Sequence, residues 1–138
     1  MKKIFLFSMF LVFVFLKAAL AQTEIKAEVD KNSLTTDEVL TYKVVVTSSE
    51  KELPAPDFPE FRGFEVVSQA RSSTVSFVKA GAKSILVYAF ILLPIDKGRI
   101  EIPPSSIKVK GEEYLSPSFE IEVMPQLPDQ ANQPRVNL

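Results

Sequence analysis

The sequence predicts an all-β protein, an antiparallel β-sandwich of seven or eight strands preceded by a signal peptide. Three observations support this fold class. Apolar and β-branched residues fall in short segments with a period of two, turn residues separate the segments at frequent intervals, and no helical period follows the N-terminal segment. Many short strands with such spacing are typical of a β-sandwich.

The first 21 residues have the organisation of a secretory signal peptide. A positively charged start precedes an apolar run from Ile4 to Leu16, and Ala19 and Ala21 occupy the positions that signal peptidase recognises. We predict cleavage between Ala21 and Gln22 and a periplasmic or secreted protein. The alternative is a membrane anchor, but this run is shorter than the roughly 20 residues that span a bilayer.

Four strands are expected in the first part of the mature chain. Glu24 to Asp30 alternates between apolar and charged residues, which is typical of a half-buried strand. After the turn-rich connection Lys31 to Glu38, Val39 to Ser48 is apolar on both faces and is expected to be central. Phe64 to Val78 predicts one long strand or a hairpin with a polar centre. Ser84 to Leu93 is the most hydrophobic segment and is expected to be covered on both faces.

Shorter strands are expected in the last part of the domain. Arg99 to Ile102 and Ile107 to Lys110 are separated by two prolines, and Gly111 to Tyr114 is expected to form a tight turn. Ser118 to Met124 alternates again. Its inward-facing side chains are expected to be Phe119, Ile121 and Val123. The tail 126–138 is rich in Pro, Gln and Asn and is expected to be disordered.

Residue composition argues against catalysis, metal binding and nucleic-acid binding. The chain has no histidine and no cysteine, which excludes triads built on these residues and the usual zinc ligands. Three of the 16 basic residues and none of the 17 acidic ones lie in the signal peptide. The mature chain is therefore acidic, with no electrostatic attraction to nucleic acid. We predict no enzyme, no cofactor, no metal and no membrane span after cleavage.

Paired acids and hydroxyl groups are the remaining candidates for chemistry. Asp37-Glu38 and Glu112-Glu113 are expected to be solvated turn charges. An enzymatic alternative, a glycosidase using Asp37 or Glu113, would need two carboxyl groups facing each other about 5 to 10 Å apart. Ser72 to Thr74 has no base nearby and is interpreted as a polar strand edge.

The order of short motifs in the second half resembles the N-terminal domain of the BatD family, the bacterial "oxygen tolerance" proteins. The motifs are Tyr88-Ala89-Phe90, Leu92-Leu93-Pro94, Lys97-Gly98, Ile102-Pro103-Pro104, Gly111 to Tyr114, Ser116-Pro117 and a final strand ending at Val123. The opening segment before residue 47 also fits the family. The resemblance covers about Glu24 to Pro125, and we assign residues 22–125 to one BatD-like domain.

The resemblance implies an immunoglobulin-like sandwich outside the cytoplasmic membrane. Family members resemble non-enzymatic scaffolds, encoded beside MoxR-type ATPases and Bat proteins with von Willebrand factor A domains. The implied partners are those Bat proteins, in an envelope complex linked to aerotolerance or stress. Typical members have further β-domains and a membrane anchor, so the resemblance leaves open whether this sequence is a single-domain relative or a truncated BatD.

The segment Glu50 to Arg62 is rich in proline and phenylalanine. Its prolines exclude a helix and a central strand, and we interpret the segment as a rigid crossover between the two sheets. Phe58 and Phe61 either anchor this loop across the open end of the sandwich or present a partner surface. Most other aromatic residues, Phe77 among them, have the spacing of core residues.

The sequence supports two hypotheses for the function. The first is an exported protein-protein interaction module that binds through a sheet edge or through loops at one end of the sandwich. Its candidate partner surface consists of Phe58, Phe61 and Ser73. The alternative is a carbohydrate-binding or adhesin-like module, which would need a flat aromatic surface formed by Phe58, Phe61 and Tyr114.

Overall fold

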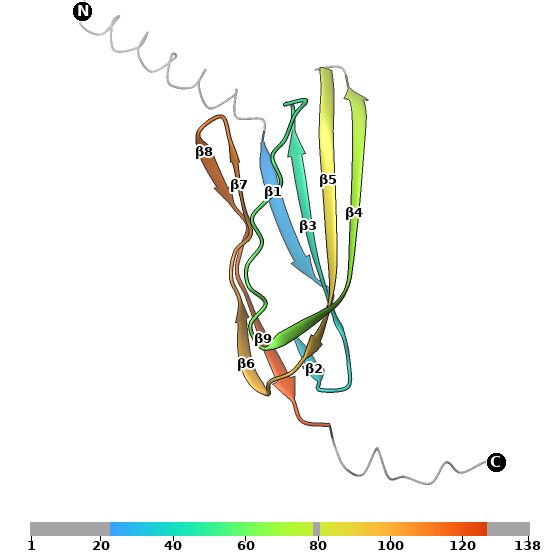
Figure 1. The fold of residues 1–138 in the computed structure, drawn as a ribbon, viewed down its shortest axis with the longest axis vertical. Helices are drawn as coiled ribbons and strands as arrows, with labels where there is room; N and C mark the ends of the chain where they lie inside the picture. Colours follow the sequence, from blue (N-terminus) through green and yellow to red (C-terminus); the bar gives the residue numbers. More distant parts are fainter. Residues whose placement is uncertain (1–22, 79–80, 127–138) are drawn as a thin grey trace, which may run out of the picture.

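The computed structural model describes residues 23–78 and 81–126, and this part of the chain folds into nine β-strands without a helix (Figure 1). The predicted signal peptide, with Ala21 and Gln22, and the tail from residue 127 lie outside the described residues. The strands are β1 (Glu24–Val29), β2 (Ser33–Thr35), β3 (Leu40–Ser48), β4 (Phe64–Val78), β5 (Gly81–Pro94), β6 (Gly98–Ile102), β7 (Ser106–Val109), β8 (Glu112–Leu115) and β9 (Phe119–Met124). The predicted all-β sandwich is confirmed.

The strands are arranged in the order of an immunoglobulin-like sandwich. One layer is a four-stranded sheet with the order β1-β3-β5-β4, and the other contains β2-β9-β6 and the hairpin β7-β8. The immunoglobulin fold has the order A-B-E-D in one sheet and C-F-G in the other. Strands β1, β3, β5 and β4 therefore correspond to A, B, E and D, and β6 and β9 correspond to F and G. The one parallel pair is β2 with β9.

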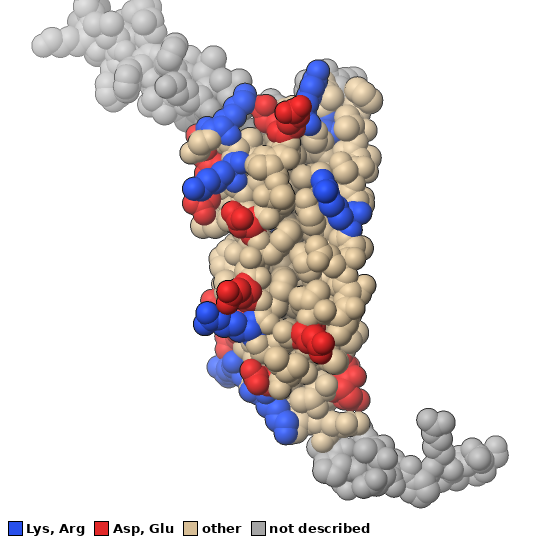
Figure 2. All heavy atoms as spheres, viewed as in Figure 1, with Lys and Arg blue, Asp and Glu red and all other residues tan. Residues whose placement is uncertain are grey.

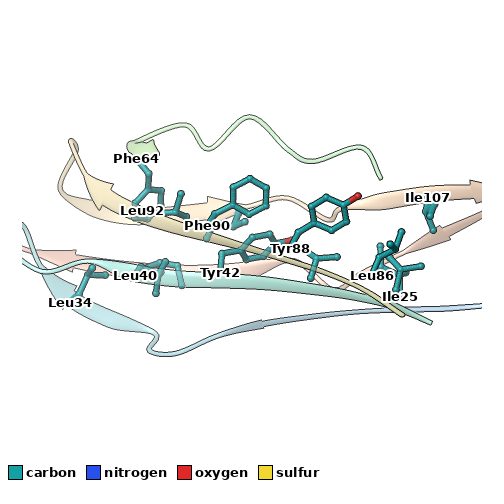
Figure 3. Close-up of a cluster of buried hydrophobic side chains, with 14 of the residues drawn as sticks. Ile25, Leu34, Leu40, Tyr42, Phe64, Leu86, Tyr88, Phe90, Leu92 and Ile107 are labelled. Atoms are coloured by element: carbon teal, nitrogen blue, oxygen red, sulfur yellow. The ribbon is translucent and has the colours of Figure 1, made fainter. Parts of the chain in front are cut away.

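The core lies between the two layers and is formed by alternate side chains of the strands (Figure 3). On β3, and on β5 from Leu86 onward, every second side chain is buried, including Tyr42, Tyr88 and Phe90. Ile121 and Val123 of β9 face them from the second layer, as predicted. The outer face of β5 is only half-buried, so the expectation that both faces are covered is wrong, because the second layer packs on one face alone.

Two segments that were expected to be connections form short strands. The described chain therefore has nine strands rather than seven or eight. β2 lies within the connection Lys31 to Glu38, and its Leu34 is 1% exposed. β8 occupies most of the expected turn Gly111 to Tyr114. The turn is instead the two residues Lys110 and Gly111, with φ of 51° and 80°, and positive φ at both positions makes the tightest hairpin connection.

The proline-rich segment occupies the place of strand C in the second layer. It leaves β3 at the end where Ser48 pairs with Ser84 and enters β4 at the opposite end, where Phe64 pairs with Pro94 (Figure 1, green trace). On the way it forms one bridge, in which Asp57 and Ser106 exchange both backbone hydrogen bonds at 2.8 and 2.9 Å. The segment thus crosses to the second layer and returns to the same sheet, instead of joining strands of two sheets.

Buried hydroxyl groups connect the two layers. The hydroxyl groups of Tyr42 and Ser105 share a hydrogen bond of 2.7 Å. The amide of Ser105 donates to the Ser116 hydroxyl at 2.9 Å, and the amide of Ser116 donates to the Ser105 carbonyl at 2.9 Å. Ser105 follows the two prolines that end β6, so these bonds satisfy polar groups where the strand pairing is interrupted.

Gly63 allows the chain to enter β4. Its φ is +85°, and a Cβ atom at this position would lie 2.9 Å from Cδ1 and 3.2 Å from Cγ2 of Ile100. Its carbonyl accepts the amide of Ile95 at 2.8 Å, which fixes the chain beside the end of β5. A residue with a side chain would have both an unfavourable φ and a steric contact here.

Tyr42→Phe is expected to lower the free energy of unfolding by about 1–3 kcal/mol, because it leaves the buried Ser105 hydroxyl without a partner. Urea denaturation of the single variants and of the double variant with Ser105→Ala measures this effect. Tyr42→Phe should cost less in the Ser105→Ala background. An equal cost in both backgrounds would contradict the proposed hydrogen bond.

Gly63→Ala is expected to cost about 1 kcal/mol more than Gly111→Ala, because Ile100 must leave its preferred rotamer. The two glycines have similar φ values, +85° and +80°, but nothing lies within 4 Å of a Cβ at Gly111. The control therefore isolates the steric contact from the backbone cost. Chemical denaturation measures both variants, and equal destabilisation would show that Ile100 accommodates the methyl group freely.

Candidate functional site

The free edge of β4 is the candidate functional site. β4 pairs with β5 from Phe64 to Val78, and it is the last strand of its sheet, so within the described residues no strand pairs with its other edge. A bulge between Val66 and Ser68 interrupts the pairing near the start. We call the regular part that follows, Ser68 to Val78, the β4 edge. Of the two alternatives that the sequence left open, one long strand or a hairpin, the structure shows one long strand.

The side chains of β4 are exposed on both faces of the sheet. Every residue from Glu65 to Val75 is exposed, and Phe77 retains 84% of its accessible surface. Figure 1 shows β4 on the side of the sandwich away from β7 and β8, beyond the second layer. The inner face of the sheet is therefore uncovered at this strand, which leaves backbone and side chains accessible together.

The two faces of the β4 edge differ in chemistry. Cross-strand pairing places Gln69, Arg71, Ser73, Val75 and Phe77 on the same face as the buried residues of β5. From Ser68 to Ser76, the opposite face presents only small or hydroxyl side chains. These are Ser68, Ala70, Ser72, Thr74 and Ser76.

Charge is scarce along this edge. Arg71 is the only charged residue of the β4 edge, and its guanidinium carbon lies 5.7 Å from the centre of the Tyr88 ring. Figure 2 shows that charged side chains gather along the side formed by β6, β7 and β8, whereas the region over β5 and β4 is mostly uncharged. A binding partner would therefore meet little electrostatic repulsion at β4.

Other exposed edges have features that oppose strand pairing. β1 is six residues long, and Glu24, Lys26 and Glu28 on its outer face are charged. The segment in the strand C position of the second layer contains prolines 54, 56 and 59, and two of them lie close to Asp57 on either side. None of the three has an N–H group to donate to a neighbouring strand. Short length, charge and proline are the usual protections of an edge. The β4 edge has none of the three apart from Arg71.

The candidate residues Phe58, Phe61 and Ser73 do not form one surface. Both phenylalanines are half-buried. Phe58 packs on Tyr88 and Phe90 with ring centres 5.0 and 4.8 Å apart, and the Phe61 ring lies 5.2 Å from that of Phe90. These contacts attach the proline-rich segment to the core. Ser73 instead lies exposed at the middle of the β4 edge.

Phe77 is the aromatic residue that sequence reasoning placed wrongly. Its inward position in the period of β4 is correct, since it faces Ala82 on the inner face. It is nevertheless exposed, because the second layer does not extend over β4. The polar residues between Gln69 and Thr74 are the sequence feature that indicates this exposure. A strand under a second layer would have apolar residues at its inward positions.

Among the described residues, Tyr114 forms no ring pair with Phe58 or Phe61, the other two aromatic residues of the carbohydrate-binding hypothesis. It lies on β8, and its hydroxyl donates to Glu112 at 3.0 Å, a bond that raises the pKa of Tyr114. Among the described residues it belongs to none of the ring pairs that attach Phe58 and Phe61 to the core. The structure therefore offers no observation in favour of a flat sugar-binding platform made from these three side chains.

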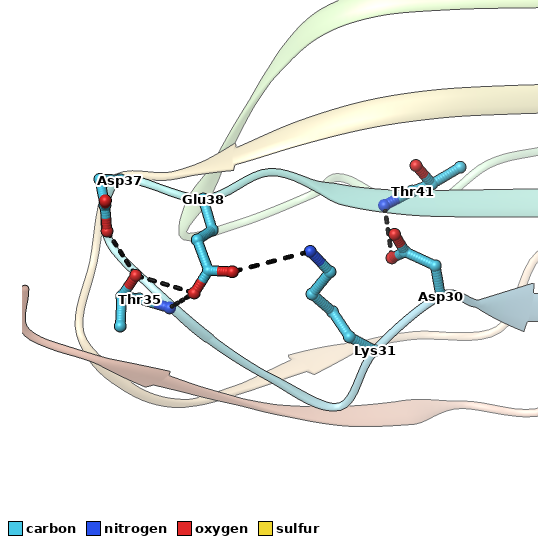
Figure 4. A network of polar contacts seen from close by, with 6 residues as sticks. All are labelled: Asp30, Lys31, Thr35, Asp37, Glu38 and Thr41. Atoms are coloured by element: carbon cyan, nitrogen blue, oxygen red, sulfur yellow. Dashed lines mark hydrogen bonds and ion pairs between the residues drawn. The ribbon is translucent and has the colours of Figure 1, made fainter. Parts of the chain in front are cut away.

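The first acidic pair, Asp37 and Glu38, takes part in the hydrogen bonds of a turn. Glu38 accepts the amide of Thr35 at 2.9 Å and the Thr35 hydroxyl at 2.8 Å, with Lys31 at 3.9 Å (Figure 4). The hydrogen bond from the Thr35 amide, with the hydroxyl bond and Lys31, lowers the pKa of Glu38. A general acid needs the opposite shift. Asp37 also lies within hydrogen-bond reach of the Thr35 hydroxyl, so this network shapes the turn between β2 and β3.

The second acidic pair lies on β8. Glu112 and Glu113 are adjacent in this strand, so their side chains point to opposite faces. Glu113 is exposed and pairs across the hairpin with Lys108. The Glu112 and Glu113 carboxyl groups therefore do not share one space, whereas those of Asp37 and Glu38 meet at the Thr35 hydroxyl, which belongs to the turn.

The structure contains no helix with the length and apolar character of a membrane span among residues 23–78 and 81–126.

Comparison with known families identifies the domain. Residues 27–123 match the family described as the BatD DUF11 like domain. Searches of curated proteins and of solved structures found no match. The matched residues begin within β1 and end within β9, so the similarity extends over the whole sandwich, including β4 and the proline-rich segment. By this match, and in agreement with its strand order and motifs, the chain belongs to the BatD family.

Proposed function

We propose that this chain is a non-enzymatic, exported protein-protein interaction module of BatD type that binds a partner through the β4 edge. The observation that carries the proposal is the free edge itself. It combines a long run of unpaired backbone groups with exposed side chains on both faces. Such an edge is a template for strand addition, in which an extended segment of a partner joins the sheet.

Strand addition explains how a site without catalytic chemistry can bind specifically. Backbone hydrogen bonds between β4 and the incoming segment supply affinity, while the side chains on alternate positions determine which sequence fits. On the inner face, Val75 is 55% exposed and Phe77 is 84% exposed, so apolar side chains of the partner can cover them. Arg71 favours an acidic or polar neighbour.

Family membership and the N-terminal segment support a proposal for the partner and the compartment. We propose that the partners are envelope proteins, namely Bat proteins with von Willebrand factor A domains, in a complex linked to aerotolerance or stress. Export through a signal peptide cleaved between Ala21 and Gln22 would bring the domain to that compartment, the periplasm or the exterior. Membership of a family not known for enzymatic activity supports a binding role.

In-cell photo-crosslinking tests the proposed surface. A photoreactive amino acid at Ser73 is expected to give a reproducible adduct with another envelope protein, identified by mass spectrometry, because Ser73 lies at the middle of the β4 edge. The same probe at Ser118, which is exposed beside β9 in the other layer, is the matched control and should give no such adduct. A probe at Phe61 separates the edge from the proline-rich segment. Adducts at Phe61 or Ser118 without one at Ser73 would refute the β4 edge as the site.

A further inference from the structure

We infer that a second copy of this chain occupies the β4 edge when the partner is absent, so that two copies form one continuous sheet about a twofold axis beside Ser73. The inference rests on the proposed function, since it assigns a resting state to the same binding edge. The partner segment would then displace the second copy.

The β4 edge needs an occupant. Its eleven residues from Ser68 to Val78 include no proline, no lysine and no glycine, and the only bulge precedes them. An edge of this length whose one protecting charge is Arg71 can add further strands unless something closes it. A symmetric dimer closes it, because each copy uses its β4 edge on the other and no further edge of that kind remains.

Twofold symmetry restricts which residue can lie at the centre of the junction. When two copies pair antiparallel about an axis perpendicular to the sheet, each face of one copy continues as the same face of the other. Residues that lie opposite each other across the junction must then belong to the same face of the sheet. The axis therefore passes beside one residue, which lies opposite the same residue of the second copy. The middle residue of the regular edge is Ser73, and a junction centred there uses the whole edge.

The side chains that this register brings together are chemically compatible. Ser72 of one copy faces Thr74 of the second, which places two hydroxyl groups within reach of a hydrogen bond. Arg71 faces Val75 of the second copy, so the two guanidinium groups are not opposed. Centring the junction on Arg71 would oppose them directly, which is unfavourable. Phe77 lies beside the aliphatic part of Gln69 and loses part of its exposure to water.

Disulfide trapping tests the register, since the chain contains no cysteine. Ser73→Cys puts one thiol beside its own copy, and directly opposed residues of antiparallel strands have Cα atoms close enough for a disulfide. The linked dimer should form about a hundredfold faster than for Ser118→Cys at micromolar chain concentration, because the dimer raises the effective thiol concentration to the millimolar range. Ser72→Cys is the control within β4, since it faces Thr74 rather than itself, and it should link slowly.

Sedimentation velocity tests the dimer without any crosslink. The chain as the cell produces it is expected to sediment as a dimer at micromolar concentration, and Ser73→Lys as a monomer, because two ammonium groups would be opposed. Ser118→Lys should remain dimeric. Thermal unfolding and circular dichroism verify that Ser73→Lys keeps its fold, which its exposed position favours.

Specific outcomes overturn the inference. A monomeric chain at the highest attainable concentration would refute the dimer, and so would equal linking rates for Ser73→Cys and Ser118→Cys. Faster linking of Ser72→Cys would refute the register. The proposed function fails separately: it is refuted if the Ser73 photo-probe links only a second copy of the chain in cells and never another protein.

Discussion

The backbone's need for hydrogen-bond partners is the constraint on which this structure depends. Two neighbouring segments meet it in opposite ways. The proline-rich segment lacks N–H groups at positions 54, 56 and 59, so it takes the place of a strand with a single bridge at Asp57. β4 has a full set of donors and acceptors, pairs along its length with β5 and leaves the other edge open. The prolines of the proline-rich segment therefore protect its edge from strand pairing, whereas the β4 edge remains available.

Packing between the layers follows from this difference. The proline-rich segment cannot form a ladder, so it is held by side chains instead, with Phe58 and Phe61 against Phe90 of β5. These rings complete the core above β3 and β5, and no further element of the described part of the chain extends over β4. The exposure of the β4 edge is thus a consequence of a narrow second layer, and stability comes from the remainder of the sandwich, where Tyr42 and Ser105 connect the layers.

The sequence allowed prediction of the features that depend on local periodicity. Alternation predicted β1 and β9 and the inward side chains of β9, and β-branched residues predicted the central β3. β2 was missed because three residues carry no period and its parallel pairing with β9 is set by distant parts of the chain. β8 was missed because the first position of its turn is Lys110, which adopts a positive φ in place of the usual Asn, Asp or Gly. Periodicity also gave the direction of Phe77 but not the extent of the layer above it.

Recognition at a strand edge differs from recognition in a cavity, because register decides it. A shift of one residue moves every side chain of the incoming strand to the opposite face. At β4 the two faces are chemically distinct, with Arg71, Val75 and Phe77 on one and small hydroxyl residues on the other. Only segments whose own alternation matches can keep apolar side chains beside Phe77 while forming the backbone ladder. Under the proposed function, the polar composition of β4, which resembles an ordinary solvated strand, would therefore suffice for selective binding at a free edge.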